Sequence, residues 1–356
     1  MSAVDSGGIR QLEVGVLGAT GMVGQQFVRL LAGHPWFKTA WLGASERSEG
    51  RTYGEAMKWR LSTPPPSDLL GMNVDACTPG RAPKVLFSAL DAGAAKDIEP
   101  AFAAAGHIVV SNARNYRMFA DVPLVIPEVN PDHLALIARQ RRERSWSGAI
   151  VTNPNCSTVV LSVVLAALRT FGLSRVMVTT LQAVSGAGYP GVASLDILGN
   201  VIPAIAGEEE KMESETQKIL GTLERDGVTP HPMVVSATTT RVPVIDGHTE
   251  SIAIEFESRP SLEDVRIALE GFRGRPQELE LPSAPPAPIV YMDAADRPQP
   301  RLDVERGNGM TVSVGRLRSC SILGTKLVAL GHNTVRGAAG AAILNAEIMV
   351  AEGMLD

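Results

Sequence analysis

The sequence predicts an α/β protein: a doubly wound parallel sheet followed by an α+β domain. Over residues 10–155, short apolar strand-like runs alternate with helical segments, an order typical of parallel strands joined by crossover helices. After Cys156 the strand-like runs become longer and are separated by loops. This change indicates a second, mostly antiparallel sheet with helices on one face. We expect the last helix, 337–352, to return to the first domain.

The first domain begins with an apolar run over 12–17 that ends at a glycine and is expected to form a buried strand. A glycine-rich turn and a segment of helical spacing follow, and the helix ends before Pro35. The strand over 39–42 then completes a strand–helix–strand unit. The remaining elements expected here are a helix over 94–105 and strands over 84–90, 106–110, 124–126 and 149–151.

Three glycines follow the first strand in the spacing Gly18-x-x-Gly21-x-x-Gly24. The first allows a tight turn, the second lets the backbone approach a pyrophosphate, and the third lets the helix pack closely on the strand. The N–H groups at the helix N-terminus favour an anion. A glycine triplet alone can be a structural turn, but this strand and helix context favours a Rossmann-type dinucleotide site. The predicted cofactor contacts of the turn are Gly18, Thr20, Gly21, Met22 and Val23.

The end of the second strand bears on the choice between NAD and NADP. An NAD enzyme usually places a carboxylate there to bind the ribose 2′-hydroxyl, but this position is Ala44. Ser45, Arg47 and Ser48 follow, and they could hold a 2′-phosphate by charge-assisted hydrogen bonds. The loop could instead be merely solvated, with Glu46 as the ribose ligand. We favour NADP as the cofactor.

The second half of the chain opens with an apolar helix expected over 157–170. Segment 282–300 is rich in proline and is expected to be irregular. We expect an NADP-binding domain from residues 1–155 and 332–356, and a catalytic and dimerisation domain from 156–331. The further elements expected are strands over 175–183, 233–237, 250–257, 309–318 and 326–330 and helices over 209–223 and 261–272.

Composition argues against several classes of protein. The 356 residues carry 33 Lys and Arg against 38 Asp and Glu, so no basic excess exists to bind nucleic acid. Residues 1–11 lack the apolar core of a signal peptide, and the longest apolar stretch, 159–168, is about half of what a bilayer requires. Three cysteines fit a reducing compartment. We expect a cytoplasmic protein with no nucleic-acid, membrane or metal site.

Cys156 is the candidate nucleophile, because it lies between a strand and an apolar helix in Asn153-Pro-Asn-Cys-Ser-Thr158. A helix N-terminus lowers the pKa of a thiol and favours the thiolate. Asn155 and Ser157 could cap the helix nearby. A buried core cysteine is the alternative. Neither Cys77 nor Cys320 is expected to begin a helix.

A thiolate nucleophile needs a proton partner, and His248 is the best candidate among six histidines. It lies in Arg241-Val-Pro-Val-Ile-Asp-Gly-His248, a turn between two strands, where functional side chains are common. His332 is a weaker candidate that could line the cofactor site. The histidines His34, His107 and His133 lie near Gly or Pro turns and are expected at the surface.

A nucleotide fold with a Cys–His pair points to an acylating aldehyde dehydrogenase. The thiolate would attack an activated acyl carbon to form a thioester, and a nicotinamide hydride would reduce that thioester to an aldehyde.

The chain resembles the aspartate-β-semialdehyde dehydrogenase family, and especially its archaeal and fungal branch, from about Val14 to the C-terminus. Several motifs in one order carry the resemblance, which makes it more specific than any one of them. They are Gly18–Gly24, Ala44–Ser48, Ser111–Met118, Asn153–Thr158, Gln182–Gly188, Gly207–Glu213, Arg241–His248 and Gly307–Met310.

The resemblance implies NADPH-dependent reduction of L-4-aspartyl phosphate to aspartate semialdehyde and phosphate, on the route to lysine, threonine, methionine and isoleucine. It implies Cys156 as nucleophile and His248 as acid/base. It further implies that Gln182 orients the substrate, Arg241 binds its α-carboxylate, Glu208 its amine, and Arg117 with Lys211 its phosphate. The cofactor contacts that go with this assignment, beyond the loops above, are Ser88, Ser185, Gly186 and Asn333.

Each of these charged residues also has an ordinary structural interpretation. Glu208 could simply stabilise a helix N-terminus, Lys211 could pair with Glu215 at i, i+4, and Arg117 could be a surface charge. Malonyl-CoA reductases resemble the same branch, but their substrate has no amine and no small phosphate. Acetylglutamyl-phosphate reductase and phosphorylating glyceraldehyde-3-phosphate dehydrogenase share the chemistry without these motifs. A non-catalytic NADP-binding protein would need neither Cys156 nor His248.

A homo-oligomer, either a dimer or a tetramer, is expected from the resemblance. The second sheet supports this expectation, because its helices would cover only one face and leave the other to be covered.

Overall fold

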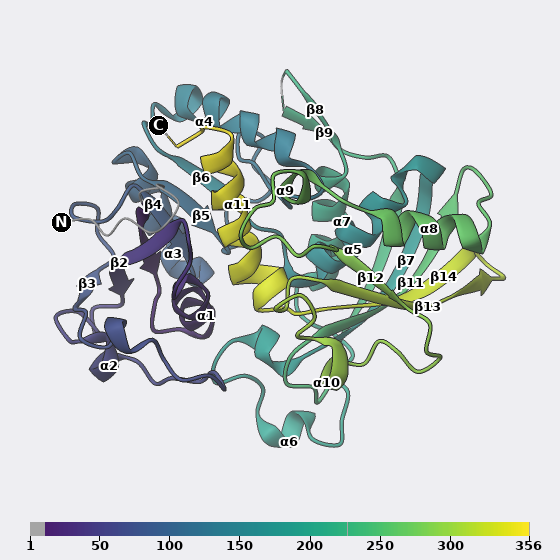
Figure 1. Ribbon diagram of the computed structural model, residues 1–356, viewed down its shortest axis with the longest axis horizontal. Coiled ribbons are helices and arrows are strands. Elements are labelled where there is room, and N and C mark those ends of the chain that lie inside the picture. The colour runs from purple at the N-terminus through teal and green to yellow at the C-terminus, as the bar shows by residue number, and fades with distance from the viewer. Residues whose placement is uncertain (1–10, 226, 356) are drawn as a thin grey trace. The chain divides into compact units, whose positions relative to one another are not determined.

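The computed structural model describes residues 11–225 and 227–355, and Figure 1 shows its elements along the chain. The first ten residues, which bear on the expected lack of a signal peptide, lie outside this range. The chain forms two compact units. Unit 1 comprises residues up to Pro123, Leu134–Asn153 and the chain from Ala342 onward, and unit 2 comprises Leu124–His133 and Pro154–Ala341. No helix of the described chain is long and apolar enough to cross a membrane.

Unit 1 contains a six-stranded sheet in the order β3-β2-β1-β4-β5-β6, with every neighbouring pair parallel. The strand order runs outward from β1 in both directions. With right-handed crossovers, this order places helix α1 on one face of the sheet and α3 on the other. The predicted Rossmann-type sheet is confirmed. Its elements are β1 Leu12–Leu17, α1 Met22–Leu31, β2 Phe37–Ala44, α2 Tyr53–Ala56, β3 Val74–Ala76, β4 Val85–Ser88, α3 Ala92–Ala104, β5 Ile108–Ser111, α4 Leu136–Arg144 and β6 Ala149–Thr152.

Two glycines of the first turn meet the steric needs that their spacing predicted. Gly18 has φ +75°, a left-handed conformation that favours glycine. A Cβ on Gly24 would lie 2.1 Å from the carbonyl oxygen of Gly18, so only glycine lets α1 approach β1 this closely.

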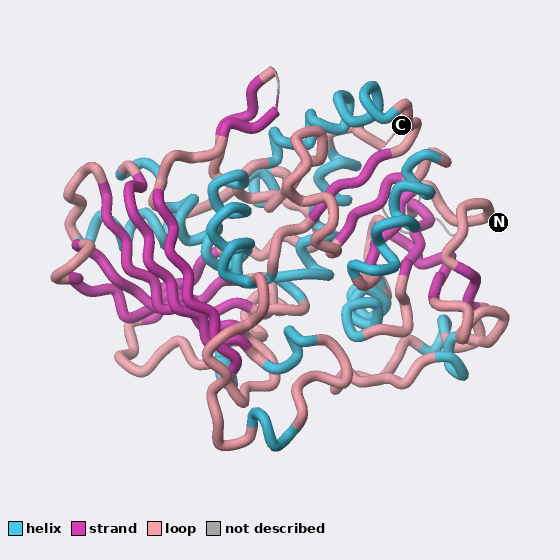
Figure 2. The backbone as a smooth tube through the Cα atoms, turned by 180° about the vertical axis from the view of Figure 1, so that it is seen from behind, coloured by secondary structure: helices cyan, strands magenta, loops and turns pink. Residues whose placement is uncertain are grey.

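Unit 2 contains a six-stranded mixed sheet in the order β10-β7-β11-β14-β13-β12. The three central pairs are antiparallel and the two outer pairs are parallel, which agrees with the mostly antiparallel prediction. Figure 2 shows its strands in magenta. Its elements are α5 Cys156–Ala167, β7 Leu173–Gln182, α6 Ser194–Ile197, α7 Glu208–Ile219, β8 Thr222–Glu224, β9 Gly227–Thr229, β10 Val234–Arg241, β11 His248–Phe256, α8 Leu262–Gly271, α9 Arg275–Glu278, β12 Ile289–Met292, α10 Pro300–Asp303, β13 Val312–Cys320 and β14 Gly324–Gly331. Helix α11, Gly340–Ala351, begins here and continues into unit 1, as expected of the last helix.

Helices α5, α7 and α8 pack on one face of this sheet and form its core. Alternate residues of β7 point to the other face, where Met177 is 53% exposed. Leu181 and Val234 are also exposed apolar side chains of these strands. We call Met177, Leu181 and Val234 the open sheet face.

The edge strand β10 is covered by hydrogen bonds rather than by another strand. The N–H of Ala237 donates to Glu213 and the N–H of Thr239 to Glu209, two acids one turn apart on α7. The N–H and C=O of Arg241 both pair with Ile202. The acidic start of α7 therefore has a structural use at this edge.

Three predictions for local elements are wrong, and one short strand lies where none is predicted. Residues 124–126 form no strand beyond an isolated bridge at Leu124, because the side chain of Asn130 bonds the N–H of Ile126 and the carbonyl of Leu124. Strand β3 was not predicted, since it has only three residues and Asp75 interrupts its apolar run. Segment 282–300 is not wholly irregular, because β12 pairs with β13 at the sheet edge, where nearby prolines are tolerated. Helix α7 ends at Ile219 instead of 223, because 222–224 belong to a hairpin.

Candidate active site

Cys156 is the first residue of α5, as predicted. The side chain of Asn155 caps this helix, since its Oδ1 accepts hydrogen bonds from the N–H groups of Ser157 (3.0 Å) and Thr158 (3.3 Å). The sulfur is half-buried at the positive end of the helix dipole. This position favours the ionised sulfur that a nucleophile requires.

The Cys156 sulfur lies 3.2 Å from Nε2 of His248, the first residue of β11. The opposite ring nitrogen, Nδ1, accepts a hydrogen bond of 3.1 Å from the N–H of Ala183. A neutral imidazole carries one proton, and an accepting Nδ1 leaves that proton on Nε2. The neutral ring therefore points an N–H donor at the sulfur.

The environment of His248 keeps it neutral. Complete burial, then the charges of Arg241 and His332, lower the pKa of the ring to about 3, against a smaller opposing effect of the Gly247 carbonyl. A neutral donor stabilises a thiolate without giving it an ion-pair partner. The Nε2–H group of His248 is thus suited to donate a hydrogen bond to an anionic sulfur or oxygen.

This protonation state predicts a pH effect. We expect the His248 ring resonances in ¹⁵N-histidine NMR to show no titration between pH 5 and 8. Unfolded chains would protonate this ring near its ordinary pKa of about 6.5, and the folded chain only near 3. The stability that wild type has over His248→Asn should therefore decline as the pH falls from about 6.5 toward 3. A ring that titrates near 6.5 in the folded protein would contradict the assignment.

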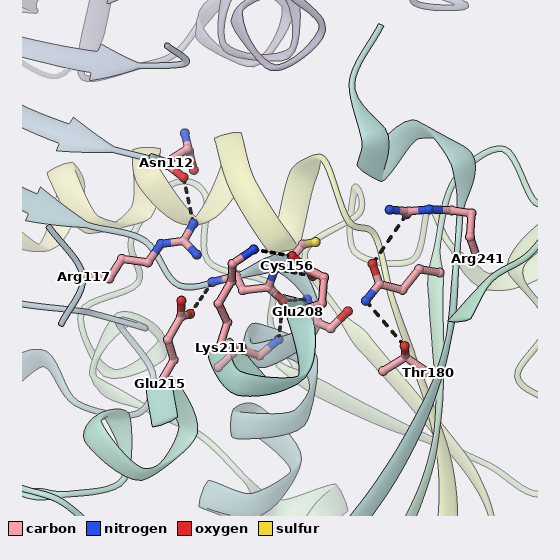
Figure 3. Close-up of polar contacts among 12 residues, drawn as sticks. Asn112, Arg117, Cys156, Thr180, Glu208, Lys211, Glu215 and Arg241 are labelled. Atoms are coloured by element: carbon pink, nitrogen blue, oxygen red, sulfur yellow. Dashed lines mark hydrogen bonds and ion pairs between the residues drawn. The ribbon is translucent and has the colours of Figure 1, made fainter. Parts of the chain in front are cut away.

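Arg241 and Gln182 end the neighbouring strands β10 and β7 and lie beside this pair. Arg241 donates to the carbonyl of Ala183 (2.8 Å) and, at 3.5 Å, to the Gln182 side chain, which in turn reaches Thr180 (Figure 3). Burial lowers the pKa of Arg241, while Cys156 and Glu208 oppose the shift. A guanidinium keeps its charge under such a shift, so a buried cation lies close to the sulfur.

Glu208 and Lys211 begin α7 and form an ion pair of 2.7 Å (Figure 3). The other oxygen of Glu208 accepts a hydrogen bond of 2.6 Å from Nδ2 of Asn155. The alternative pairing of Lys211 with Glu215 is wrong, because Lys211 forms its ion pair with Glu208. Glu215 accepts a hydrogen bond from the backbone N–H of Asn155 at 2.6 Å. Two acids of α7 therefore hold the residue that precedes the nucleophile.

Two glycines leave room at the pair. A Cβ on Gly186 would lie 2.8 Å from a guanidinium nitrogen of Arg241 and 3.0 Å from the His248 ring. A Cβ on Gly337, in the wide helical turn Val335–Ala339, would lie 2.6 Å from Cβ of Cys156. Such turns recur at functional sites.

Three predicted cofactor residues also gather here. The side chain of Asn333 donates to Ser185 (2.8 Å) and accepts from the N–H of Gly247 (2.8 Å), and Gly186 follows Ser185 directly. Asn333 therefore holds the turn that leads into His248.

The other predicted cofactor residues lie in unit 1, at the carboxyl ends of its strands. The N–H groups of Gly18 and Ala19 bond the carbonyl of Gly43, which places the glycine turn beside the loop after β2. Ser45 and Arg47 are exposed in that loop, whereas Ser48 is buried. Gly21 precedes α1, whose N-terminus has no side-chain cap among the described residues. Thr20 in this turn is half-exposed, as are Met22 and Val23 at the start of α1.

Ser88 and Arg117 are buried in unit 1. Ser88 ends β4 and is fully covered. Arg117 donates to the carbonyl of Asn112 at 2.7 Å, so it is more than an exposed surface charge. Its predicted partnership with Lys211 stays a prediction, as Lys211 belongs to unit 2.

The other cysteines and histidines are not part of the Cys156–His248 pair. Cys77 follows β3 and Cys320 ends β13, so neither begins a helix, as predicted. The prediction that three histidines lie at the surface is wrong. They are buried because each has a polar partner: His34 pairs with Glu347, His107 with the carbonyl of Pro83, and His133 with Asn130. The described chain holds no cluster of three or more His, Cys, Asp or Glu that could bind a metal ion.

Two contributors were missed by sequence reasoning. Glu215 lies two helical turns after Glu208 and therefore on the same face of α7, a spacing that could have drawn attention to it. The sequence predicts Gly337 only as the start of a helix, and no local pattern reveals that it lies against Cys156.

Comparisons with known proteins show which family the chain is similar to. Residues 13–137 match the family model "Semialdehyde dehydrogenase, NAD binding domain", and residues 165–336 match "Semialdehyde dehydrogenase, dimerisation domain". The chain is 51% identical over 343 residues to an aspartate-semialdehyde dehydrogenase of Archaeoglobus fulgidus, across 96% of this chain and 99% of that one. It is also 51% identical over 360 residues to that of Cryptococcus neoformans, across 97% and 98%. A crystal structure of the Candida albicans aspartate semialdehyde dehydrogenase with NADP matches with a TM-score of 0.89 at 45% identity, across 97% and 99%.

Proposed function

The chain belongs to the aspartate-semialdehyde dehydrogenase family, and from this premise we propose the reaction and the roles of its residues. It reduces L-4-aspartyl phosphate with NADPH to aspartate semialdehyde and phosphate, reversibly. The observation that carries the proposal is the Cys156 sulfur 3.2 Å from His248 at a helix N-terminus, beside Arg241. The product serves the synthesis of lysine, threonine, methionine and isoleucine.

The charges of the site complement those of the substrate. Arg241 binds the α-carboxylate, for which a planar guanidinium suits bidentate contact. Glu208 binds the ammonium group, and Arg117 with Lys211 the phosphate. Gln182, bonded to Arg241, orients the substrate. Because Lys211 and Glu208 pair with each other, an acyl phosphate that carries an ammonium group would replace one internal ion pair with two new ones.

Catalysis begins when the Cys156 thiolate attacks the acyl carbon. The new C–S bond gives a thioester as the C–O bond to phosphate breaks, and the departing phosphate takes up the proton that the reaction consumes. When bound, the cofactor supplies the hydride that reduces the thioester carbon. The C–S bond then breaks to release the aldehyde and restore the thiolate.

His248 acts as the acid/base partner through Nε2. Its N–H donates a hydrogen bond to the thiolate. The same N–H can donate to the carbonyl oxygen of the bound acyl group when that oxygen becomes anionic. Because the thiolate is released at the end of each turnover, the ring need not take up a proton from sulfur in every cycle.

The cofactor is NADP. The tight turn at Gly18, the uncapped N-terminus of α1 and the exposed Ser45 and Arg47 fit a dinucleotide with a 2′-phosphate. Ser48, Ser88, Ser185, Gly186 and Asn333 complete the proposed contacts.

The loop after β2 makes this choice of cofactor testable. We expect Arg47→Ala to weaken NADP binding by about tenfold or more, because it removes a charge-assisted contact, and to leave NAD binding unchanged. Isothermal titration calorimetry measures both. Arg51→Ala removes the same charge from the same exposed loop and serves as the control. Equal losses for both cofactors would mean that Arg47 does not bind the 2′-phosphate.

The protein forms a homodimer through the open sheet face. The match to a dimerisation domain and the apolar residues left exposed on β7 and β10 support this assembly, and two such dimers could form a tetramer. It works in the cytoplasm, where its three thiols stay reduced.

A charge on the open sheet face should separate the subunits. We expect Met177→Glu to halve the mass measured by size-exclusion chromatography with light scattering, because the carboxylate would be buried without a partner. Ile267→Glu, at an exposed position of α8, is the matched control and should keep the wild-type mass. A Met177→Glu protein of wild-type mass would place the interface elsewhere.

The reaction is tested in the reverse direction. Purified protein with NADP, aspartate semialdehyde and phosphate should produce NADPH, measured as absorbance at 340 nm, and omission of phosphate should abolish the signal. Turnover of malonyl-CoA with NADPH, with none of aspartate semialdehyde, would reassign the substrate. Cofactor binding without turnover of either would indicate a non-catalytic protein.

A further inference from the structure

Helix α7 holds the residue before the nucleophile at two points. Glu208 and Glu215 are buried on one face of this helix, which packs against α5. One accepts from the side chain of Asn155 and the other from its backbone N–H, each at 2.6 Å. Figure 3 shows both acids directed at the start of α5.

These contacts leave Asn155 little freedom. Its Oδ1 caps α5 through two N–H groups, its Nδ2 bonds Glu208, and its N–H bonds Glu215. Asn155 is joined directly to Cys156 in the chain. The direction of the Cα–Cβ bond of Cys156, and so the place of the sulfur, depends on where this N–H is held.

Glu215 differs from Glu208 in what it can do. Glu208 is paired with Lys211 beside Asn155 and has a proposed role with substrate. Glu215 is 2% exposed and its Oε2 faces the protein backbone. Without it, the buried N–H of Asn155 would lose a charge-assisted hydrogen bond.

We propose that Glu215 is a positioning residue for the nucleophile. Its carboxylate fixes the N–H of Asn155, and through it the sulfur of Cys156 relative to His248. This inference rests on the proposed function of Cys156. A shift of about 1 Å in a reacting group can cost about 100-fold in rate, so the effect should appear in kcat.

Two variants of Glu215 separate the effect of side-chain length from the effect of the carboxylate charge. Glu215→Gln keeps an oxygen at the same distance and loses the charge, whereas Glu215→Asp keeps the charge and withdraws the oxygen by one methylene. We expect Glu215→Asp to lower kcat by about 10- to 100-fold with little change in KM, and Glu215→Gln to retain most of kcat. Glu210→Ala, at an exposed position of the same helix, should match wild type.

A second measurement does not depend on turnover. The rate of alkylation of Cys156 by iodoacetamide, followed by mass spectrometry of its peptide, should fall in Glu215→Asp and stay near wild type in Glu215→Gln. The proposal is overturned if Glu215→Asp matches wild type in both kcat and alkylation, or if Glu215→Gln is the more impaired variant. If wild type fails to turn over aspartate semialdehyde, the proposed function fails, while alkylation still tests the role of Glu215.

Discussion

Replacement of Cys156 by serine should lower turnover of aspartate semialdehyde by at least about 10³-fold, the scale of loss when a covalent nucleophile is removed. Serine has nearly the same shape, but its hydroxyl does not ionise near neutral pH. The N-terminus of α5 and the Nε2–H of His248 stabilise an anion that serine cannot supply. The loss should appear in kcat at 340 nm, with NADP affinity by calorimetry unchanged.

Cys320→Ser is the control for this experiment. Cys320 ends β13 and has no place in the pair, so this variant should keep wild-type turnover. A Cys156→Ser enzyme with more than a few per cent of wild-type kcat would refute the nucleophile assignment. Loss of NADP binding in the same variant would mean that the substitution disturbs the fold.

A single methyl group at Gly337 should lower kcat by about 100-fold, the cost of displacing a reacting group by about 1 Å. The added Cβ would lie 2.6 Å from Cβ and 2.9 Å from Cα of Cys156, closer than nonbonded carbon atoms approach. Since the conflict involves the backbone of Cys156 and not a flexible side-chain end, the nucleophile itself must move.

Slower alkylation of Cys156 by iodoacetamide should accompany the loss of activity in Gly337→Ala. Gly271→Ala provides the matched control. Gly271 ends α8, and no described atom beyond its chain neighbours and its own helix backbone lies within 4 Å of the Cβ that alanine would add. The control should keep wild-type activity. If Gly337→Ala shows wild-type kcat and alkylation, the turn at Val335–Ala339 does not fix the sulfur.

The sequence was informative where local rules decide the structure. The glycine spacing after β1 and the position of Cys156 at a helix start follow from strand–turn–helix chemistry, which short stretches of sequence specify. Residues 124–126 were misjudged because one side chain, Asn130, replaces a neighbouring strand. Apolar content cannot distinguish these two ways to satisfy a buried backbone.

The sequence could predict which residues belong to the candidate site better than it could predict the contacts between them. Cys156 and His248 are 92 positions apart, and only folding shows that they lie within hydrogen-bond distance. The partners of Lys211 and Glu215 could not be deduced, because i, i+3 and i, i+4 pairings on one helix are close in energy. Long-range donors such as the N–H of Asn155 decide between them.

The way α7 covers β10 limits how copies of this protein can associate. A bare sheet margin can recruit a strand from another molecule and start open-ended polymerisation. Here the N–H groups of Ala237 and Thr239 are already occupied by Glu213 and Glu209. In the proposed dimer the open sheet face is covered once one partner has bound. Helix α7, which holds Asn155, also occupies the sheet margin at which open-ended growth could start.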